Sequence, residues 1–211
     1  MKTALTTREL RSYKVRDRKI PLKMLTCYDF QTAQLLNETP LDMILVGDSL
    51  GNVILGYENT IKVSLEEMTI FSSAVKRGAP NKFVIGDMPF GTYSTLEDGI
   101  RNATHLFQKS SVEAIKLEGA FPYQLELISR LVQTGIPVMG HIGLTPQSVH
   151  QLGGYYIHGK NSTSKEMLLT SARNLQEAGV FALVLECVES SLAAIITEEL
   201  SIPTIGIGSG K

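Results

Sequence analysis

The segment AIKLEGAFPYQLELISRLVQTGIPVMGHIG, residues 114–143, contains the unit from which the fold is predicted. It opens with an apolar run at residues 114–117, continues with an amphipathic stretch over residues 123–133, and returns to an apolar run at residues 138–142. Gly135 and Pro137 separate the amphipathic stretch from the second run, as is common where a helix ends. The segment is therefore predicted to form a strand, a helix and a second strand.

The same order repeats along the rest of the chain. Strand-like runs occur at residues 22–28, 43–46, 83–88, 182–188 and 203–207. Helices are predicted at residues 31–36, 64–77, 95–109, 165–178 and 191–200, and Ser64 with Glu67 forms a capping box at the start of the second of these. A polar, glycine-rich loop is expected at residues 145–162. This alternation implies a parallel sheet that is covered by helices.

A parallel sheet of this kind is either doubly wound or closed into a barrel. No G-x-G-x-x-G motif follows the first strand, which argues against a dinucleotide-binding domain. We therefore predict the α/β class and a (β/α)8 TIM-type barrel, as a single domain over residues 1–211. A complete barrel usually needs about 250 residues, and these 211 residues end after the seventh strand-like run. The barrel is thus expected to be C-terminally incomplete, without its eighth strand.

The composition of the chain argues against some kinds of binding partner and some cellular compartments. The net charge of -1 gives no reason to expect nucleic acid or an anionic membrane as partner. No run reaches the roughly 18 apolar residues that a membrane span requires, and residues 1–19 lack the apolar stretch of a signal peptide. Cys27 and Cys187 both lie in strand-like runs, so a disulfide scaffold is not expected. These features predict a soluble, cytoplasmic protein.

Ionisable side chains occur at the ends of five successive predicted strands. They are Asp48, Asp87, the pair Lys116 and Glu118, His141, and Glu186. In (β/α) barrels the catalytic groups come from the C-terminal ends of several strands. Because a buried unpaired charge is costly, each group should meet a metal, a counter-charge or a substrate. We therefore expect these side chains to face one cavity.

Each residue also has a purely structural interpretation. An aspartate after a strand often caps a helix or starts a turn, which could apply to Asp48 and Asp87. Lys116 and Glu118 could form a structural ion pair, and His141 could be a hydrogen-bonded core residue. Glu186 could be held by a structural partner, although its neighbours in sequence are apolar. The joint occurrence at one end of the sheet favours an active site.

The residue types indicate a chemistry. Two or three carboxylates without paired histidines or cysteines suit a hard cation such as Mg²⁺. Zinc is less favoured because neither cysteine has a partner at zinc spacing, and His141 and His150 do not form H-E-x-x-H. A metal that is chelated by a 2-oxo acid polarises its ketone, and a carboxylate base can then remove a neighbouring proton. Enolate formation followed by attack on an electrophile is the predicted reaction type.

The glycine-rich end of the chain, GIGSGK at residues 206–211, is not a P-loop, because Ile205 stands where the motif needs glycine. The loop after the seventh strand binds phosphate in many barrels. Phosphate binding and close approach of the backbone to a ligand both remain open for this segment.

Several of these stretches match one family. They are VGDSLG at 46–51, RGAP at 77–80, KLEG at 116–119, GHIGLTPQS at 140–148, GGY at 153–155, LECV at 185–188 and IPTIGIG at 202–208. Together they resemble the ketopantoate hydroxymethyltransferase family, in one register from about residue 22 to residue 211. The HIGLTPQS and VGDSLG stretches are the most specific of them.

The resemblance implies a reaction and roles for the residues. The family transfers a one-carbon unit from 5,10-methylenetetrahydrofolate to 3-methyl-2-oxobutanoate, which gives 2-dehydropantoate for pantothenate biosynthesis. It implies one Mg²⁺ per subunit at Asp48 and Asp87, with Glu118 bound to the metal directly or through water. The positions that contact the oxo acid match Asp48, Ser49, Asp87 and Lys116. His141 lies in the pocket by the same match, and Glu186 matches the proton acceptor.

The resemblance also implies a homo-oligomer, often a decamer, and a longer chain. Family members continue through a last helix, an eighth strand and C-terminal helices, which are absent from these 211 residues. A molecule that ended at Lys211 would leave strand edges unpaired and is expected to be poorly stable.

Two other hypotheses remain. One is a lyase or mutase of the related isocitrate lyase-like and phosphoenolpyruvate mutase-like barrels, which is disfavoured because Cys27 and Cys187 lie in predicted strands rather than in a loop. The other is a non-catalytic barrel that binds metal without turnover.

Overall fold

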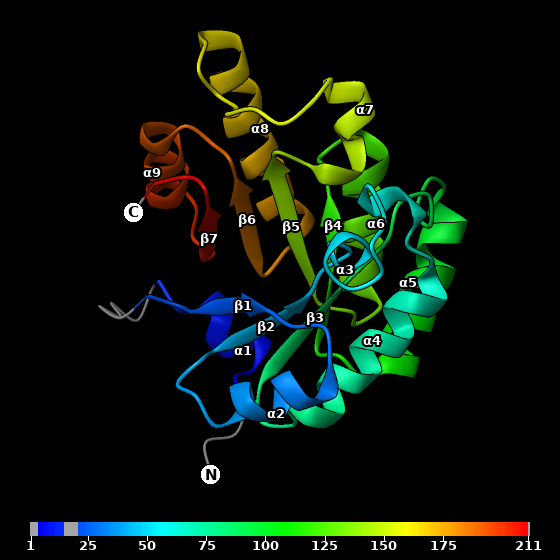
Figure 1. Cartoon of the computed structure of the whole chain (residues 1–211). Coiled ribbons are helices and arrows are strands. Elements are labelled where there is room, and N and C mark those ends of the chain that lie inside the picture. Colours follow the sequence, from blue (N-terminus) through cyan, green and yellow to red (C-terminus); the bar gives the residue numbers. More distant parts are fainter. Residues whose placement is uncertain (1–3, 15–20, 211) are drawn as a thin grey trace.

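The computed structural model describes residues 4–14 and 21–210. Its centre is a sheet of seven parallel strands that follow each other in chain order. The strands are β1 (Met24–Thr26), β2 (Met43–Val46), β3 (Phe83–Asp87), β4 (Ala114–Glu118), β5 (Val138–Gly143), β6 (Ala182–Glu186) and β7 (Thr204–Ile207). The sheet curls so that β1 and β7, its two edges, come near each other (Figure 1). The (β/α) barrel class is therefore confirmed, in a nearly closed form.

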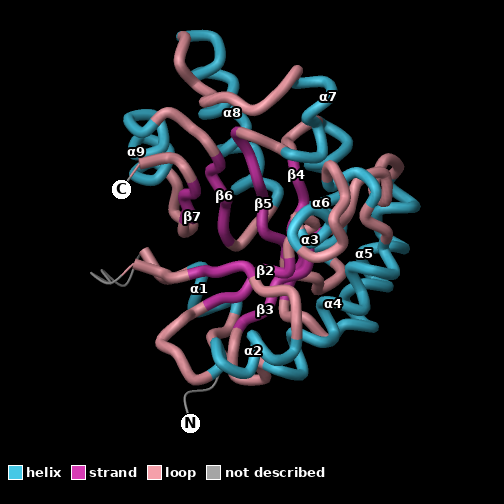
Figure 2. Tube along the Cα trace, in the orientation of Figure 1, coloured by secondary structure: helices cyan, strands magenta, loops and turns pink. Residues whose placement is uncertain are grey.

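Helices connect the strands and surround the sheet (Figure 2). The longer ones are α2 (Phe30–Asn37), α4 (Leu65–Gly78), α5 (Leu96–Ser110), α6 (Pro122–Gln133), α8 (Ser162–Ala178) and α9 (Ser190–Glu199). The short ones are α1 (Thr7–Arg11), α3 (Leu50–Val53), η1 (Thr60–Lys62), η2 (Pro146–Ser148) and α7 (Val149–Leu152). The predicted capping box is confirmed, since Ser64 accepts from the amide of Glu67 and the Glu67 carboxylate accepts from the amide of Ser64.

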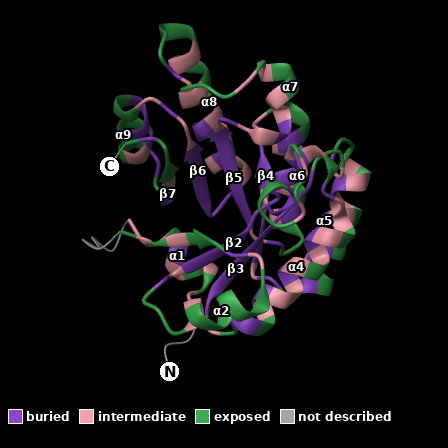
Figure 3. Cartoon of the chain, viewed as in Figure 1, coloured by how far each residue is buried: buried purple, intermediate pink, exposed green. Residues whose placement is uncertain are grey.

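Side chains of each strand alternate between two apolar clusters, as the pleat requires. One cluster lies between the strands and the outer helices, and includes Ile44, Val84 and Ile115. The other contains strand residues of alternate parity together with Leu10 of α1 and Phe181, which precedes β6. Its strand members are Met43, Leu45, Phe83, Ile85, Ala114, Met139, Ala182 and Val184. Figure 3 shows that β2 to β6 are mostly buried, whereas the edge strands β1 and β7 are intermediate or exposed. The inner cluster fills the barrel toward the N-terminal ends of the strands.

Two details of the sequence prediction were wrong. The segment 145–162 is not entirely a loop, because η2 and α7 lie within it. These helices have three and four residues, too few to show a helical period. Cys27 and Cys187 lie just after β1 and β6, not within them, and both are free thiols. The strand position of the cysteines therefore no longer argues against a lyase.

The edges β1 and β7 flank a cavity of about 960 Å³, which is also lined by residues of α9. The described residues contain seven strands, so no eighth strand joins these edges within them. Within the same residues, no helix combines the length and the apolar character needed to cross a membrane.

Candidate active site

The predicted site residues converge on one cavity of about 370 Å³ at the C-terminal ends of the strands. All seven of them line it, namely Asp48, Ser49, Asp87, Lys116, Glu118, His141 and Glu186. The side chain of Glu186 is 22% exposed, whereas those of Lys116, Glu118 and His141 are 2–5% exposed. Glu186 therefore lies at the accessible side of a buried polar cluster.

Strand register explains the convergence. Asp87 pairs with Lys116 across β3 and β4, and Glu118 pairs with His141 across β4 and β5. Asp48 follows β2 directly, and its amide donates to Asp87 Oδ2 at 3.1 Å. Paired residues of neighbouring parallel strands project to the same face of the sheet, so the charged groups meet at one level of the barrel.

Asp48, Asp87 and Lys116 form the more enclosed half of the cluster. Lys116 Nζ lies 3.1 Å from Asp87 Oδ1. Burial, together with the charges of Asp87 and Glu118, raises the pKa of Asp48 to about 7. Burial also raises the pKa of Asp87, although Lys116 opposes that rise. Burial alone would lower the pKa of Lys116, but the charges of Asp87, Glu118 and Asp48 outweigh it and raise that pKa. Lys116 therefore stays protonated, whereas the carboxyl groups of Asp48 and Asp87 are costly to ionise.

His141 lies between the other two carboxylates, those of Glu118 and Glu186. Its Nδ1 lies 3.4 Å from Glu118 Oε1, and its Nε2 lies 3.2 Å from Glu186 Oε2. Lys116 Nζ is also 3.3 Å from His141 Nδ1. Burial and the charge of Lys116 would lower the pKa of His141, but the carboxylates of Glu118 and Glu186 outweigh them and raise it. Burial on its own would raise the pKa of Glu118. The hydrogen bond and charge of His141, together with the charge of Lys116, outweigh burial and lower that pKa.

The donor set fits a divalent cation at Asp48 and Asp87. Asp87 Oδ1 is buried and accepts no well-aligned hydrogen bond from any described residue, although Lys116 is near it. Among the described residues, no group of three or more His, Cys, Asp or Glu side chains is arranged to hold a metal. Mg²⁺ commonly uses only one or two protein carboxylates and completes its shell with water and substrate oxygens. The two aspartates meet that need, and both oxygens of Glu118 already have neighbours in His141 and the amide of Gln147.

The sequence prediction missed residues that organise the site. Gln147 donates from Nε2 to Asp48 Oδ2 at 2.8 Å, and it accepts at Oε1 from the Tyr93 hydroxyl at 2.5 Å. The hydroxyls of Tyr28 and Ser49 are 2.8 Å apart. Gln147 belongs to the GHIGLTPQS stretch, and the family match of that stretch was the one feature of the sequence that could have pointed to this residue. Its contact with Asp48 spans 99 positions of the chain, so no local pattern could reveal it.

The glycine-rich end has a structural role in this fold. Ser209 is buried, and its hydroxyl donates to the carbonyl of Leu185 and accepts from the amide of Val188. Gly208 has a φ of 64°, and a Cβ there would lie 3.2 Å from the sulfur of Cys187. The glycines therefore allow the segment to pack against the end of β6, while phosphate binding stays a prediction.

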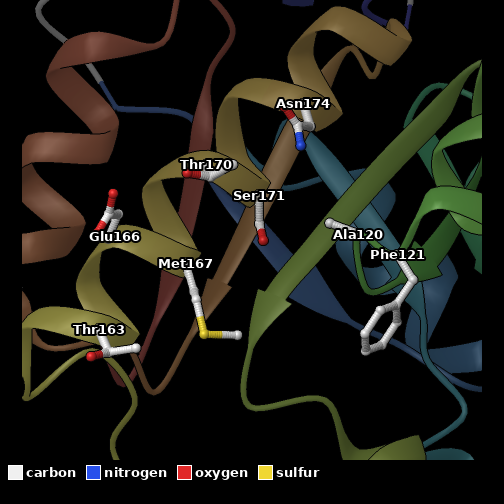
Figure 4. Close-up of a pocket in the computed structure, with 8 residues that line it drawn as sticks. All are labelled: Ala120, Phe121, Thr163, Glu166, Met167, Thr170, Ser171 and Asn174. Carbon is white, nitrogen blue, oxygen red and sulfur yellow. The ribbon is translucent and has the colours of Figure 1, made fainter.

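A separate hollow lies beside the site, between α8 and the loop after β4 (Figure 4). It is lined by Ala120, Phe121, Thr163, Glu166, Met167, Thr170, Ser171 and Asn174. It contains none of the predicted site residues.

Sequence comparisons identify the family. The profile of ketopantoate hydroxymethyltransferase matches residues 4–211. The chain belongs to the ketopantoate hydroxymethyltransferase family. It is 54% identical over 194 residues to the 3-methyl-2-oxobutanoate hydroxymethyltransferase of Thermotoga neapolitana, which covers 92% of this chain and 71% of that one. The corresponding enzyme of Leptospira interrogans is 49% identical, with 92% and 73% covered. The predicted family and its class of enzyme, a hydroxymethyltransferase, are thereby confirmed.

Solved structures support the fold. A 2,3-dimethylmalate lyase, described as a member of the PEP mutase/isocitrate lyase superfamily, matches with a TM-score of 0.67 at 17% identity, over 95% of this chain and 71% of that one. A phosphonopyruvate hydrolase in complex with oxalate and Mg²⁺ matches with a TM-score of 0.70 at 10% identity, over 96% and 72%. Identities this low establish the barrel architecture alone.

Proposed function

We propose that this hydroxymethyltransferase moves a one-carbon unit from 5,10-methylenetetrahydrofolate to 3-methyl-2-oxobutanoate, giving 2-dehydropantoate for pantothenate biosynthesis through an enolate of the oxo acid. The observation that carries the proposal is the convergence of charged groups from five neighbouring strands on one buried cavity. Family membership supports the oxo acid as a substrate, because the relatives carry the name 3-methyl-2-oxobutanoate hydroxymethyltransferase.

In this proposal Asp48 and Asp87 would hold Mg²⁺, with Glu118 bound to it directly or through water. A bound Mg²⁺ supplies Lewis acidity to the 2-oxo acid, which increases the acidity of the neighbouring C–H. Lys116 stays protonated beside Asp87 and attracts the carboxylate of the oxo acid as a point charge. Ser49, which is held by the Tyr28 hydroxyl, offers a hydroxyl to the same substrate.

Glu186 is the base in this proposal. Its carboxylate is accessible from the cavity, and it is the most exposed member of the charged cluster. It removes the proton from C3 of the oxo acid, and C3 of the resulting enolate attacks the methylene carbon of the donor as one C–N bond of that carbon breaks. Water then adds to the same carbon, the second C–N bond breaks, and tetrahydrofolate leaves with the hydroxymethyl group on C3. His141, which lies between Glu118 and Glu186, orients the base and lines the substrate pocket.

The direct test is product formation. Purified protein is incubated with 3-methyl-2-oxobutanoate, 5,10-methylenetetrahydrofolate and Mg²⁺, and 2-dehydropantoate is measured by mass spectrometry. Product that requires all three components is expected. Cleavage of a substrate such as 2,3-dimethylmalate without folate would indicate a lyase, and metal binding without turnover would indicate a non-catalytic barrel.

The family relationship further predicts a homo-oligomer, often a decamer, that works in the cytoplasm. Light scattering coupled to size-exclusion chromatography tests the first part, and a monomer would contradict it.

A further inference from the structure

We infer that Gln147, held by Tyr93, is a positioning residue that fixes the carboxylates of Asp48 and Glu118 in the geometry that the metal and the oxo acid require. This inference rests on the proposed function. It assigns Gln147 no contact with the reacting atoms.

The first observation is that Gln147 connects two strands of the site. Its side-chain Nε2 donates to Asp48 Oδ2 at 2.8 Å, and its backbone amide donates to Glu118 Oε2 at 3.1 Å. Asp48 follows β2 and Glu118 ends β4, so one residue restrains carboxylates from both. A carboxylate with a fixed donor loses rotational freedom before a ligand arrives, which lowers the entropic cost of binding.

The second observation is that the amide of Gln147 has only one favourable orientation. Its Nε2 also donates to the carbonyl of Met88 at 2.9 Å, so both N–H bonds are used on acceptors. Its Oε1 accepts from the Tyr93 hydroxyl at 2.5 Å. A flipped amide would place Oε1 against a carboxylate and a carbonyl, with two lost hydrogen bonds and a repulsion. The acceptors of Asp48 and Met88 thus select this orientation, and the Tyr93 hydroxyl completes it by donating to Oε1.

The third observation is that the loop leading to Gln147 is packed closely against β6. Leu144 donates its amide to the carbonyl of Glu186 at 2.8 Å, which ties the loop to β6. A Cβ at Gly143 would lie 2.2 Å from the same carbonyl, so the approach depends on glycine. Gln147 and Tyr93 are 6% and 7% exposed. Both side chains are therefore held from every side rather than free to follow a ligand.

The test measures Mn²⁺ affinity by isothermal titration in the wild type, Gln147→Met, Tyr93→Phe and the double variant. Methionine keeps the length of the side chain but removes its hydrogen bonds. Gln147→Met is expected to weaken Mn²⁺ binding by about 10-fold to 100-fold, as loss of an outer-shell partner does. Tyr93→Phe should weaken it less, and should add nothing in the Gln147→Met background, because it acts through Gln147.

The matched control is Gln124→Met. Gln124 is as buried as Gln147, but among the described residues the hydrogen bonds of its side-chain amide go to backbone groups, the carbonyl of Glu118 and the amide of Phe121. It should lower the melting temperature about as much as Gln147→Met and change the Mn²⁺ affinity less than about 2-fold. Equal losses of affinity in the two variants would assign Gln147 a purely structural role and overturn the inference.

The outcomes separate this inference from the proposed function. Wild-type turnover together with unchanged Mn²⁺ affinity in Gln147→Met would overturn the positioning role and leave the reaction intact. Weakened affinity together with no wild-type turnover would do the reverse. If the wild type binds no Mn²⁺, crystal structures decide the matter, since Asp48 must change rotamer in Gln147→Met and keep it in Gln124→Met.

Discussion

The two ends of the barrel interior differ, although the same strands build both. Toward the N-terminal ends, the inward residues are apolar, for example Met43 on β2 and Phe83 on β3. Toward the C-terminal ends, the alternation arrives at Asp87 on β3 and Lys116 on β4, and Asp48 follows the end of β2; all three line the cavity. Side chains at the apolar end stabilise the fold by packing. At the charged end, burial of ionisable side chains costs folding free energy. The residues that stabilise the barrel and the residues that are expected to carry out its chemistry therefore lie at opposite ends of the same strands.

Phe83→Ala tests the apolar end and should have the largest effect. Phe83 is 1% exposed and packs edge-on against Phe181 with ring centroids 5.4 Å apart. Loss of the ring should lower the free energy of unfolding by about 3–5 kcal/mol, measured by urea denaturation. Phe90→Ala is the control, because Phe90 lies beyond the other end of β3 and is 48% exposed. It should cost under about 0.5 kcal/mol. Equal losses would contradict the separation, and Phe83→Leu serves if the alanine variant does not fold.

Asp87→Asn tests the charged end. The change should reduce turnover by about 100-fold or more, which corresponds to roughly 2.7 kcal/mol of transition-state stabilisation. The metal-free protein should lose little stability, since burial raises the pKa of Asp87 and already disfavours its charge. Steady-state kinetics and thermal melts measure the two effects. A large loss of stability with unchanged turnover would show that Asp87 is a structural residue.

Asp48 gives a pH prediction for the metal-free protein. Burial raises the pKa of Asp48 to about 7, above the usual value of 3.8 that the unfolded chain has. The folded state therefore binds more protons between these values, and stability should fall as pH rises through that range. Relative to Asp48→Asn, the wild type should lose about 2 kcal/mol between about pH 5 and pH 7 in urea denaturation with a chelator present. If the free energy of unfolding changed with pH in the same way in the wild type and in Asp48→Asn, Asp48 would not be the cause of the pH dependence.

Ser64→Ala, at the start of α4 and outside the lining of the cavity, should have the smallest effect. Ser64 caps α4 by accepting from the amide of Glu67 at 3.2 Å. Its loss should cost about 1 kcal/mol of stability. Turnover at a temperature where the protein is folded should be unchanged. A drop in turnover without a drop in stability would mean that α4 influences the site.

The sequence predicted the parts of the molecule that depend on local pattern. The apolar runs located the strands, and Ser64 with Glu67 located the start of α4. The charged residues at strand ends were predicted to share a cavity because parallel strands align their C-terminal ends, and the structure brings them together. The short helices α1 and α3 were missed, since five and four residues give too little periodicity.

Other features depend on contacts that no local pattern contains. The placement of Leu10 inside the apolar cluster follows from packing against strands that come much later in the chain. The link from Gln147 to Asp48 requires the completed barrel. The cysteines were misplaced by one residue at strand ends, where a backbone turn such as the φ of 49° at Cys187 decides the boundary.

Hydrogen–deuterium exchange at C3 of 3-methyl-2-oxobutanoate, followed by NMR with and without Mg²⁺, tests the proposed chemistry of the charged end most directly. The half-reaction needs no folate, so it isolates the enolate step. The wild type should exchange the proton only with metal present, and Glu186→Gln should slow the exchange by about 100-fold or more, as loss of a general base does. Absence of exchange from folded protein, or exchange that is unchanged in Glu186→Gln, would contradict the assignment of this end of the barrel to enolate chemistry.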